Sequence, residues 1–215
     1  MGELHERYRP QKWSGVVGQD AAISAIQEAL KDGWGGRAWW IVGETGTGCT
    51  TIAWLLAKEQ ADEKRVRRAT GDEVECPMVE RMGEANPGGE RTVVPRAYII
   101  DGPLITYMPE DAMHLLSKTL ACLPKNVCVI FAMNPEDEYA FTGRGEPAQQ
   151  IVRACHRVKL ETKGLEEPFA QRAKEIAEKE GLGGKDISIY RKLARDCHCS
   201  MWGMLSQIET WEPSE

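Results

Sequence analysis

The sequence predicts an α/β fold, in which helices flank a central parallel sheet, followed by a small C-terminal helical domain. Short segments that are apolar on both faces, as in buried parallel strands, alternate with helical patterns up to about residue 160. A glycine-rich turn follows the first of these segments, and the pattern from Leu165 onward is helical only. We therefore expect an α/β domain over residues 1–162 and a helical lid over residues 163–215.

The α/β domain begins with a helix that Asp20 can cap and that continues to Leu30, with its apolar residues on one face. Glycines within residues 33–36 end this helix. Residues 38–42 then form the first strand, which is apolar on both faces. The glycine-rich turn leads from this strand to a helix over residues 51–59.

The rest of the domain continues the alternation. Residues 61–95 are polar and irregular, and the basic run at 64–68 is interpreted as a solvated strand edge, with phosphate contact as the alternative. Buried strands are predicted over 97–100 and 127–132, and Pro109 opens a helix between them. The last strand and the three helices of the lid are expected over residues 155–160, 169–180, 187–196 and 201–211.

Composition and charge exclude several classes of protein. The 215 residues correspond to one or two domains of roughly 150 residues, enough to bury a core without disulfides. The net charge is −6, so any contact with DNA would have to be a local basic patch. No apolar run approaches the roughly 20 residues of a membrane span, and the charged N-terminus is unlike a secretory signal. We expect a cytoplasmic protein whose seven scattered cysteines are free thiols.

Residues 43–50 match a phosphate-binding loop with one substitution. The full pattern is glycine, four residues and Gly-Lys-Ser/Thr, and Cys49 occupies the lysine position here. Such glycines let successive backbone N–H groups point into one concavity at the N-terminus of the next helix. Asp101 ends a buried strand, where a carboxylate can hold magnesium. The alternative is a glycine-rich turn that binds nothing, beside an ordinary solvated strand end.

Cys49 itself allows two interpretations. The dipole at a helix N-terminus lowers the pKa of a thiol, whereas burial against the preceding strand raises it. Because phosphate loops open toward their ligand, we expect a lowered pKa and a reactive Cys49 thiol. The alternative is an inert thiol that is buried as a small hydrophobic side chain.

Several tracts along the chain carry a family resemblance. They are Arg7-Tyr8-Arg9-Pro10, Val16-Val17-Gly18-Gln19, the loop at 43–50, Tyr98-Ile99-Ile100-Asp101, residues 113–120, Ala132-Met133-Asn134 and residues 174–181. Through these tracts, over about residues 4–210, the chain resembles clamp-loader subunits of the AAA+ class. It is similar to the bacterial DNA polymerase III gamma/tau and delta-prime subunits and to the small subunits of replication factor C. The resemblance implies a P-loop AAA+ domain with a five-stranded parallel sheet and a role in DNA replication.

The resemblance also implies a nucleotide site. ATP or ADP would contact a set of twelve residues, and Thr50 and Asp101 would also bind magnesium. These twelve are Tyr8, Arg9, Pro10, Val17, Gly43, Gly46, Gly48, Cys49, Thr50, Thr51, Asp101 and Asn134. The implied partners are other AAA+ clamp-loader subunits in an oligomer, a sliding clamp and primer-template DNA, and no membrane.

Four charged groups of the family's hydrolytic site are replaced. Cys49 stands at the position of the loop lysine, and Gly102 stands at that of the catalytic glutamate. Ala154 and Trp202 stand at the positions of the arginine finger and the sensor-2 arginine. The expected subunit binds nucleotide weakly, hydrolyses little or no ATP and serves in assembly. Two alternatives stay open: an active ATPase, in which Arg144 or Arg153 supplies charge, and a pseudo-ATPase adaptor unrelated to sliding clamps.

Two further modules of the family are not expected. Only Cys76 lies between residues 52 and 121, which leaves no four-cysteine zinc module. Cys197-His198-Cys199 lacks the spacing of a zinc site. The sequence stops at Glu215, shortly after the lid, so no collar domain is expected.

Overall fold

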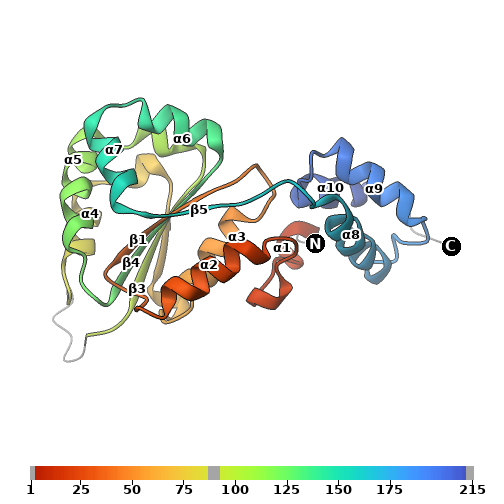
Figure 1. Cartoon of the computed structure of the whole chain (residues 1–215), viewed down its shortest axis with the longest axis horizontal. Helices are drawn as coiled ribbons and strands as arrows, with labels where there is room; N and C mark the ends of the chain where they lie inside the picture. The colour runs from red at the N-terminus through yellow and green to blue at the C-terminus, as the bar shows by residue number, and fades with distance from the viewer. Residues whose placement is uncertain (1–2, 87–92, 212–215) are drawn as a thin grey trace.

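Five strands form one parallel sheet, in the order β2-β3-β4-β1-β5 (Figure 1). The computed structural model describes residues 3–86 and 93–211. The strands are β1 (Arg37–Val42), β2 (Val66–Ala69), β3 (Arg96–Asp101), β4 (Val127–Met133) and β5 (His156–Lys159). The prediction of a five-stranded parallel sheet is therefore confirmed.

Helices cover both faces of the sheet and form the lid at its side (Figure 1). One face carries α2 (Asp20–Leu30) and α3 (Cys49–Ala57), and the other carries α4 (Cys76–Gly83), α5 (Glu110–Thr119), α6 (Pro135–Thr142) and α7 (Glu146–Ala154). The lid consists of α8 (Glu166–Lys179), α9 (Ile187–Asp196) and α10 (Met201–Ile208), and a short α1 (Leu4–Arg7) opens the chain. Among the described helices, none is both long and apolar enough to cross a bilayer.

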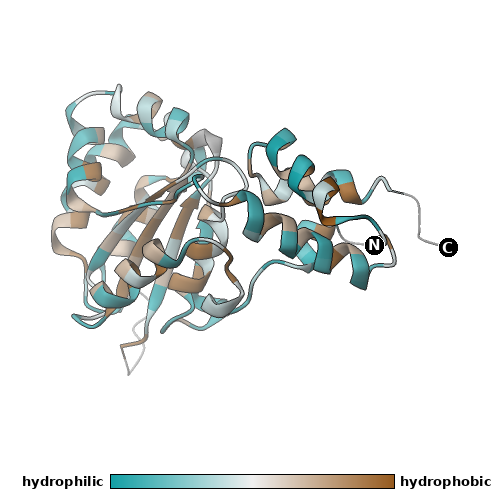
Figure 2. Ribbon diagram, turned by 45° about the vertical axis from the view of Figure 1, so that its right-hand side comes forward, coloured by the Kyte–Doolittle hydropathy of each residue, from teal (hydrophilic) through white to brown (hydrophobic). Residues whose placement is uncertain are grey.

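Both faces of the sheet are buried because neighbouring side chains of a strand point in opposite directions. Trp39 and Ile41 of β1 pack against α2 and α3, whereas Trp40 packs with Phe131 and the helices on the other face. The rings of Trp40 and Phe131 lie 4.8 Å apart. Figure 2 shows the same division, with hydrophobic strands inside and hydrophilic residues on the outer sides of the helices.

The register of the strands gathers their carboxyl ends at one edge. Val42 pairs with Met133, and Asp101 pairs with Ala132. The glycine-rich loop follows β1 directly, and Asn134 follows β4 directly. The loop, Asp101 and Asn134 therefore meet at the edge of the sheet where open α/β folds bind ligands.

Several elements differ from the sequence prediction. α3 begins at Cys49 rather than at residue 51, because Gly48 before it takes a φ of 114°, a conformation that glycine adopts without strain. Residues 61–95, predicted as irregular, contain β2 and α4, which are only 4 and 8 residues long and too short for a clear periodic pattern. Two further helices, α6 and α7, also lie where no helix is predicted.

The N-terminal segment packs on the lid rather than on the sheet. Leu4 is buried in the core that α8, α9 and α10 form. Arg7 and Tyr8 donate hydrogen bonds to a carboxylate oxygen of Glu180, at the end of α8, over 2.7 and 2.6 Å. Residues 4–8 thus pack on the lid, although the expected division assigns them to the domain over residues 1–162.

Close contacts of the N-terminal tract hold the segment that connects β5 to the lid. Leu165 packs on Gly18, where a Cβ atom would lie only 2.3 Å from the Leu165 side chain. The buried Gln19 side chain donates a hydrogen bond to the carbonyl of Glu161 over 2.9 Å and accepts one from its N–H over 3.2 Å. The connection after β5 is thus held by side chains of the N-terminal tract.

Candidate functional site

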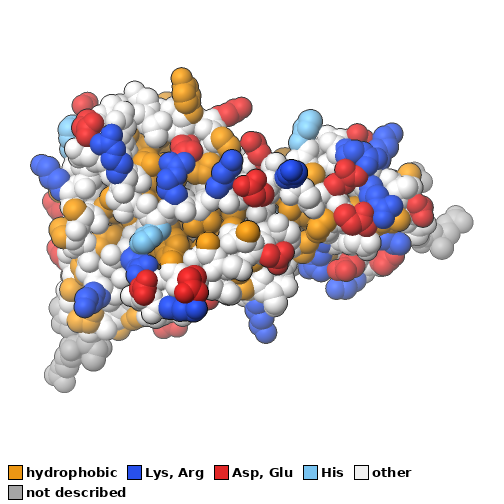
Figure 3. All heavy atoms as spheres, in the orientation of Figure 1, with side chains coloured by type: hydrophobic (Ala, Val, Ile, Leu, Met, Phe, Trp, Pro, Cys, Tyr) orange, Lys and Arg blue, Asp and Glu red, His pale blue; other side chains and the backbone are white. Residues whose placement is uncertain are grey.

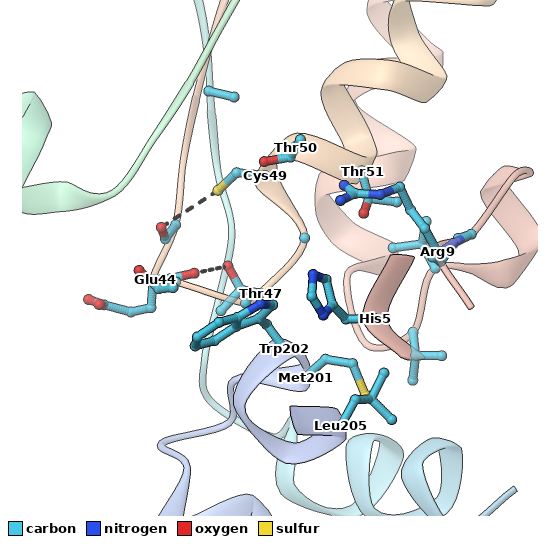
Figure 4. Close-up of a pocket in the computed structure, with 18 of the residues that line it drawn as sticks. His5, Arg9, Glu44, Thr47, Cys49, Thr50, Thr51, Met201, Trp202 and Leu205 are labelled. Carbon is cyan, nitrogen blue, oxygen red and sulfur yellow. Dashed lines mark hydrogen bonds between the residues drawn. The ribbon is translucent and has the colours of Figure 1, made fainter. Parts of the chain in front are cut away.

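One cavity opens at the carboxyl edge of the sheet, between the glycine-rich loop and the lid (Figure 4). Its volume is about 600 Å³. All twelve residues predicted from the sequence line it, although they come from the N-terminal tract, the loop and the ends of β3 and β4. The lid adds apolar and basic side chains, among them Phe169, Arg172, Ile176 and Leu205.

The loop has the shape of a phosphate cradle. Gly46 and Gly48 have φ angles of 85° and 114°, and no described side chain caps the N-terminus of α3. The hydroxyl of Thr47 donates to the carbonyl of Glu44 over 2.7 Å and fixes the turn. The first N–H groups of α3 therefore lack a capping side chain at an edge where the helix dipole favours an anion.

The lid rests directly on this loop. The N–H of Met201 donates to the carbonyl of Gly46 over 3.1 Å. A Cβ atom at Gly46 would lie 2.1 Å from the hydroxyl oxygen of Ser200, so glycine is required by the close approach as well as by φ. The start of α10 thus covers one side of the cradle.

The prediction of a reactive Cys49 is wrong. Its Sγ lies 3.6 Å from the carbonyl oxygen of Gly43 and 3.7 Å from that of Met133, on the side of the strands. Burial raises the pKa of the Cys49 thiol from 9.0 to about 12, and the nearby Asp101 carboxylate adds to the rise. Cys49 is half-buried, and desolvation outweighs the helix dipole, so its thiol is closer to the inert alternative than to a reactive one.

Asp101 lies where a magnesium ligand is predicted, but an arginine already neutralises it. The Thr50 hydroxyl donates to Asp101 Oδ1 over 3.3 Å. The guanidinium of Arg68, from β2, lies 2.8 Å from Asp101 Oδ2. The contact is an ion pair without the geometry of a directed hydrogen bond, because Oδ2 is buried and accepts no hydrogen bond from the described residues.

The site fits the nucleotide and the magnesium ion of the predicted ligand differently. The glycine cradle and the uncapped helix start suit the phosphates of a nucleotide. Beside phosphates, magnesium is held by one or two protein carboxylates together with water and phosphate oxygens, and the Asp101 carboxylate is paired with Arg68. The donor set of Thr50 and Asp101 does not fit magnesium as the structure has it.

Asn134 is a helix cap as well as a cavity residue. Its side-chain oxygen accepts a hydrogen bond from the N–H of Asp137 over 2.7 Å and caps α6. Because the oxygen already caps α6, the side-chain NH₂ group of Asn134 is the part that remains free to donate to a ligand.

The N-terminal tract and the lid form the apolar end of the cavity. Pro10 and Val17 face it together with Phe169 and Ile176 of α8. Tyr8 also lines the cavity, but its hydroxyl donates to Glu180, and this hydrogen bond raises the pKa of Tyr8. Tyr8 therefore fixes the tract to the lid as well as lining the site.

Some cavity residues are not evident from sequence motifs. His5 contacts Trp202 edge to face beside the loop, with ring centroids 5.9 Å apart (Figure 4). Arg68 appears in the sequence only as part of a basic run. Both residues follow from the packing of α1 on the lid and of β2 on β3, which no motif encodes.

The proposed substitutes for the arginine finger lie elsewhere. Arg144 donates to the carbonyl of Met108 over 2.6 Å, and Arg153 pairs with Glu146 at 3.2 Å. Both line a separate, shallow hollow over α6 and α7. Neither side chain reaches the cavity of its own chain.

The cysteines do not gather into a metal site in the part of the chain that the structure describes. Within residues 3–86 and 93–211, no three His, Cys, Asp or Glu side chains are placed to share a metal ion. His198 and Cys199 take φ angles of 51° and 55° in the turn before α10. This left-handed turn directs the chain back toward the loop, where Ser200 and Met201 contact Gly46.

Comparison with known proteins supports the predicted resemblance, although no family model matches the chain. DNA polymerase III subunit gamma of Buchnera aphidicola subsp. Acyrthosiphon pisum is 27% identical over 232 residues, covering 96% of this chain and 60% of that protein. The same subunit of Buchnera aphidicola subsp. Baizongia pistaciae is 46% identical over 55 residues, 26% of this chain and 15% of that protein. The chain thus spans no more than 60% of the length of these relatives. The predicted resemblance to clamp-loader proteins is confirmed.

Solved structures confirm the fold. A RuvB variant from Thermotoga maritima superimposes with a TM-score of 0.68 at 14% identity, covering 94% of this chain and 64% of that one. A DNA polymerase III gamma subunit-related protein from the same organism gives a TM-score of 0.50 at 12% identity, covering 80% and 58% of the two chains. The chain has the P-loop AAA+ fold.

Proposed function

We propose that this chain is a clamp-loader-like AAA+ subunit that acts in DNA replication in the cytoplasm, as an assembly module with weak nucleotide binding and little or no ATP hydrolysis. The observation that carries the proposal is a retained cavity without its catalytic charges. The twelve predicted residues line one cavity, whereas Cys49 turns its thiol toward the strands. Similarity to one DNA polymerase III gamma subunit over 96% of the chain supports the replicative role.

Electrostatics explains why hydrolysis would be slow. ATP supplies the phosphoryl group, and its transfer is accelerated by positive charges that stabilise the spreading negative charge. An arginine finger alone contributes roughly a thousandfold or more. Gly102, Ala154 and Trp202 provide no such charge, and neither Arg144 nor Arg153 reaches the cavity of its own chain to promote hydrolysis there. The cavity can bind and orient phosphates, but the four family positions that promote phosphoryl transfer carry no charge in this chain.

The proposed partners are other AAA+ clamp-loader subunits, a sliding clamp and primer-template DNA. On the face that Figure 3 shows, basic and acidic side chains intermingle over the lid. Together with the net charge of −6, this mixture favours protein assembly over bulk attraction to DNA. Contact with DNA would then take place within an assembly and through local basic residues.

Sedimentation of purified components tests the proposal. The chain is mixed with purified clamp-loader subunits and the sliding clamp of its source organism, with and without primer-template DNA. We expect a stable complex that contains the chain together with an AAA+ subunit. Binding to neither the subunits nor the clamp would contradict the proposal and favour an adaptor unrelated to clamps. Hydrolysis by the chain alone, at the rate of an active subunit, would favour the ATPase alternative.

A further inference from the structure

Arg68 reaches the cavity because of the register between β2 and β3. Arg68 pairs with Ile99, two residues before Asp101, so both side chains lie on the same face of the sheet. The Arg68 side chain is 53% exposed and extends toward Asp101, whose own side chain is 8% exposed. One end of the pair is therefore buried, while the guanidinium stays accessible from the cavity that it lines.

The Arg68 guanidinium puts a positive charge beside Asp101, where a magnesium ion would otherwise sit. An arginine side chain keeps its positive charge at every pH at which proteins are folded. A magnesium ion on the Asp101 carboxylate would lie within a few ångströms of that charge, whether it bound Oδ1 beside Thr50 or took the place of Arg68 at Oδ2, 2.8 Å away. Like charges at this distance repel, so Arg68 and magnesium compete for one carboxylate.

The same guanidinium has donors left for a ligand. Among the described residues, no acceptor takes a directed hydrogen bond from Arg68, and its one ion pair is with Asp101. A planar guanidinium carries five N–H donors in a fork that matches phosphate oxygens. The loop itself lacks its usual cation, because Cys49 is neutral and points toward the strands. Arg68 is thus an accessible cation beside the glycine cradle.

We propose that Arg68 replaces both the loop lysine and the magnesium ion, so that the cavity binds a nucleoside di- or triphosphate without a metal. The inference rests on the nucleotide cavity of the proposed function and specifies its ligand as the free polyphosphate. One part of the guanidinium neutralises Asp101, and the other donates to the phosphates above the cradle. Magnesium in solution then weakens binding, because it withdraws the free nucleotide and competes for Asp101.

Calorimetric titration with ATP and with ADP tests this proposal, in excess EDTA and in excess magnesium. For the unmodified chain, we expect binding in EDTA that is at least as tight as binding in magnesium. Arg68→Ala should weaken binding in EDTA by roughly tenfold to a hundredfold, the loss of one hydrogen bond to a charged group. The same variant should bind more tightly with magnesium than without, because Asp101 is released.

Two matched variants separate a ligand contact from a structural ion pair. Arg67→Ala removes the neighbouring arginine, which lies on the opposite face of β2, and should bind ATP as the unmodified chain does. Arg68→Lys keeps the charge on Asp101 without the fork and should lose part of the affinity. Melting curves of all variants without ligand establish that each is folded.

The outcomes are distinct from those of the proposed function. Binding that requires magnesium in the unmodified chain, or absence of binding in both media, would overturn the role of Arg68. Equal affinities of Arg68→Ala and Arg67→Ala would also overturn it. None of these results affects the association with clamp-loader subunits that sedimentation measures, so each proposal can fail separately.

Discussion

Alkylation of the cysteines measures how strongly desolvation suppresses the reactivity of the half-buried Cys49 thiol. Burial raises the pKa of its thiol from 9.0 to about 12, and its Sγ faces the carbonyl oxygens of Gly43 and Met133. Because the thiolate is the reactive form, the difference of about three pKa units lowers the reactive fraction roughly a thousandfold at neutral pH. We expect iodoacetamide to modify Cys49 about a thousandfold more slowly than an ordinary thiol.

The chain contains its own reference for this measurement. Cys122 is exposed, whereas Cys128 is completely buried. After timed quenching, peptide mapping by mass spectrometry should find Cys122 modified first and Cys49 among the last. The rate at Cys49 should rise about tenfold for each pH unit across the range in which the protein stays folded, since the thiolate fraction increases in that proportion.

A denatured sample completes the experiment. In guanidinium chloride, burial is lost and the cysteines should react at similar rates, which shows that slow labelling of Cys49 depends on the fold. Rapid labelling of Cys49 in the native protein, ahead of Cys122, would refute the reasoning. The helix dipole would then outweigh desolvation, and the thiol would face the cavity.

Three other perturbations test the loop and the lid. Cys49→Lys should strengthen ATP binding by about 1.5–3 kcal/mol in calorimetry, the range for a hydrogen bond to a charged group; unchanged affinity would mean that the loop holds no phosphate. Phosphate release from ATP should stay at background in the unmodified chain and in Cys49→Lys, because catalytic groups that act as a unit are not restored singly; a turnover of about one per second would contradict this. Gly46→Ala should lower the melting temperature more than Gly181→Ala, with a further loss of about 1–3 kcal/mol, because both glycines have positive φ but only at Gly46 would a Cβ meet Ser200, at 2.1 Å. Equal melting temperatures would show that the lid does not rest on the loop.

Local sequence patterns predicted four of the five strands, and the family resemblance added twelve of the residues that line the cavity. The strands at 38–42, 97–100 and 127–132 are evident because a parallel strand buried on both faces is apolar throughout. The loop at 43–50 is evident because its glycines are consecutive in the sequence and their conformational role is local. Once these strands pair in register, Asp101 and Asn134 must lie beside the loop.

The direction and partner of individual side chains were decided only by the tertiary structure. The sequence places Cys49 at the N-terminus of a helix, but the pKa of its thiol depends on its burial against the strands. Arg68 belongs to a basic run typical of a solvated edge, and only the pairing of β2 with β3 brings it to Asp101. Leu4 is near the N-terminus, yet it is buried with helices that begin at residue 166. Burial, strand register and charge pairing depend on residues that are far apart in the chain. The local periodicity of the sequence therefore cannot predict these contacts.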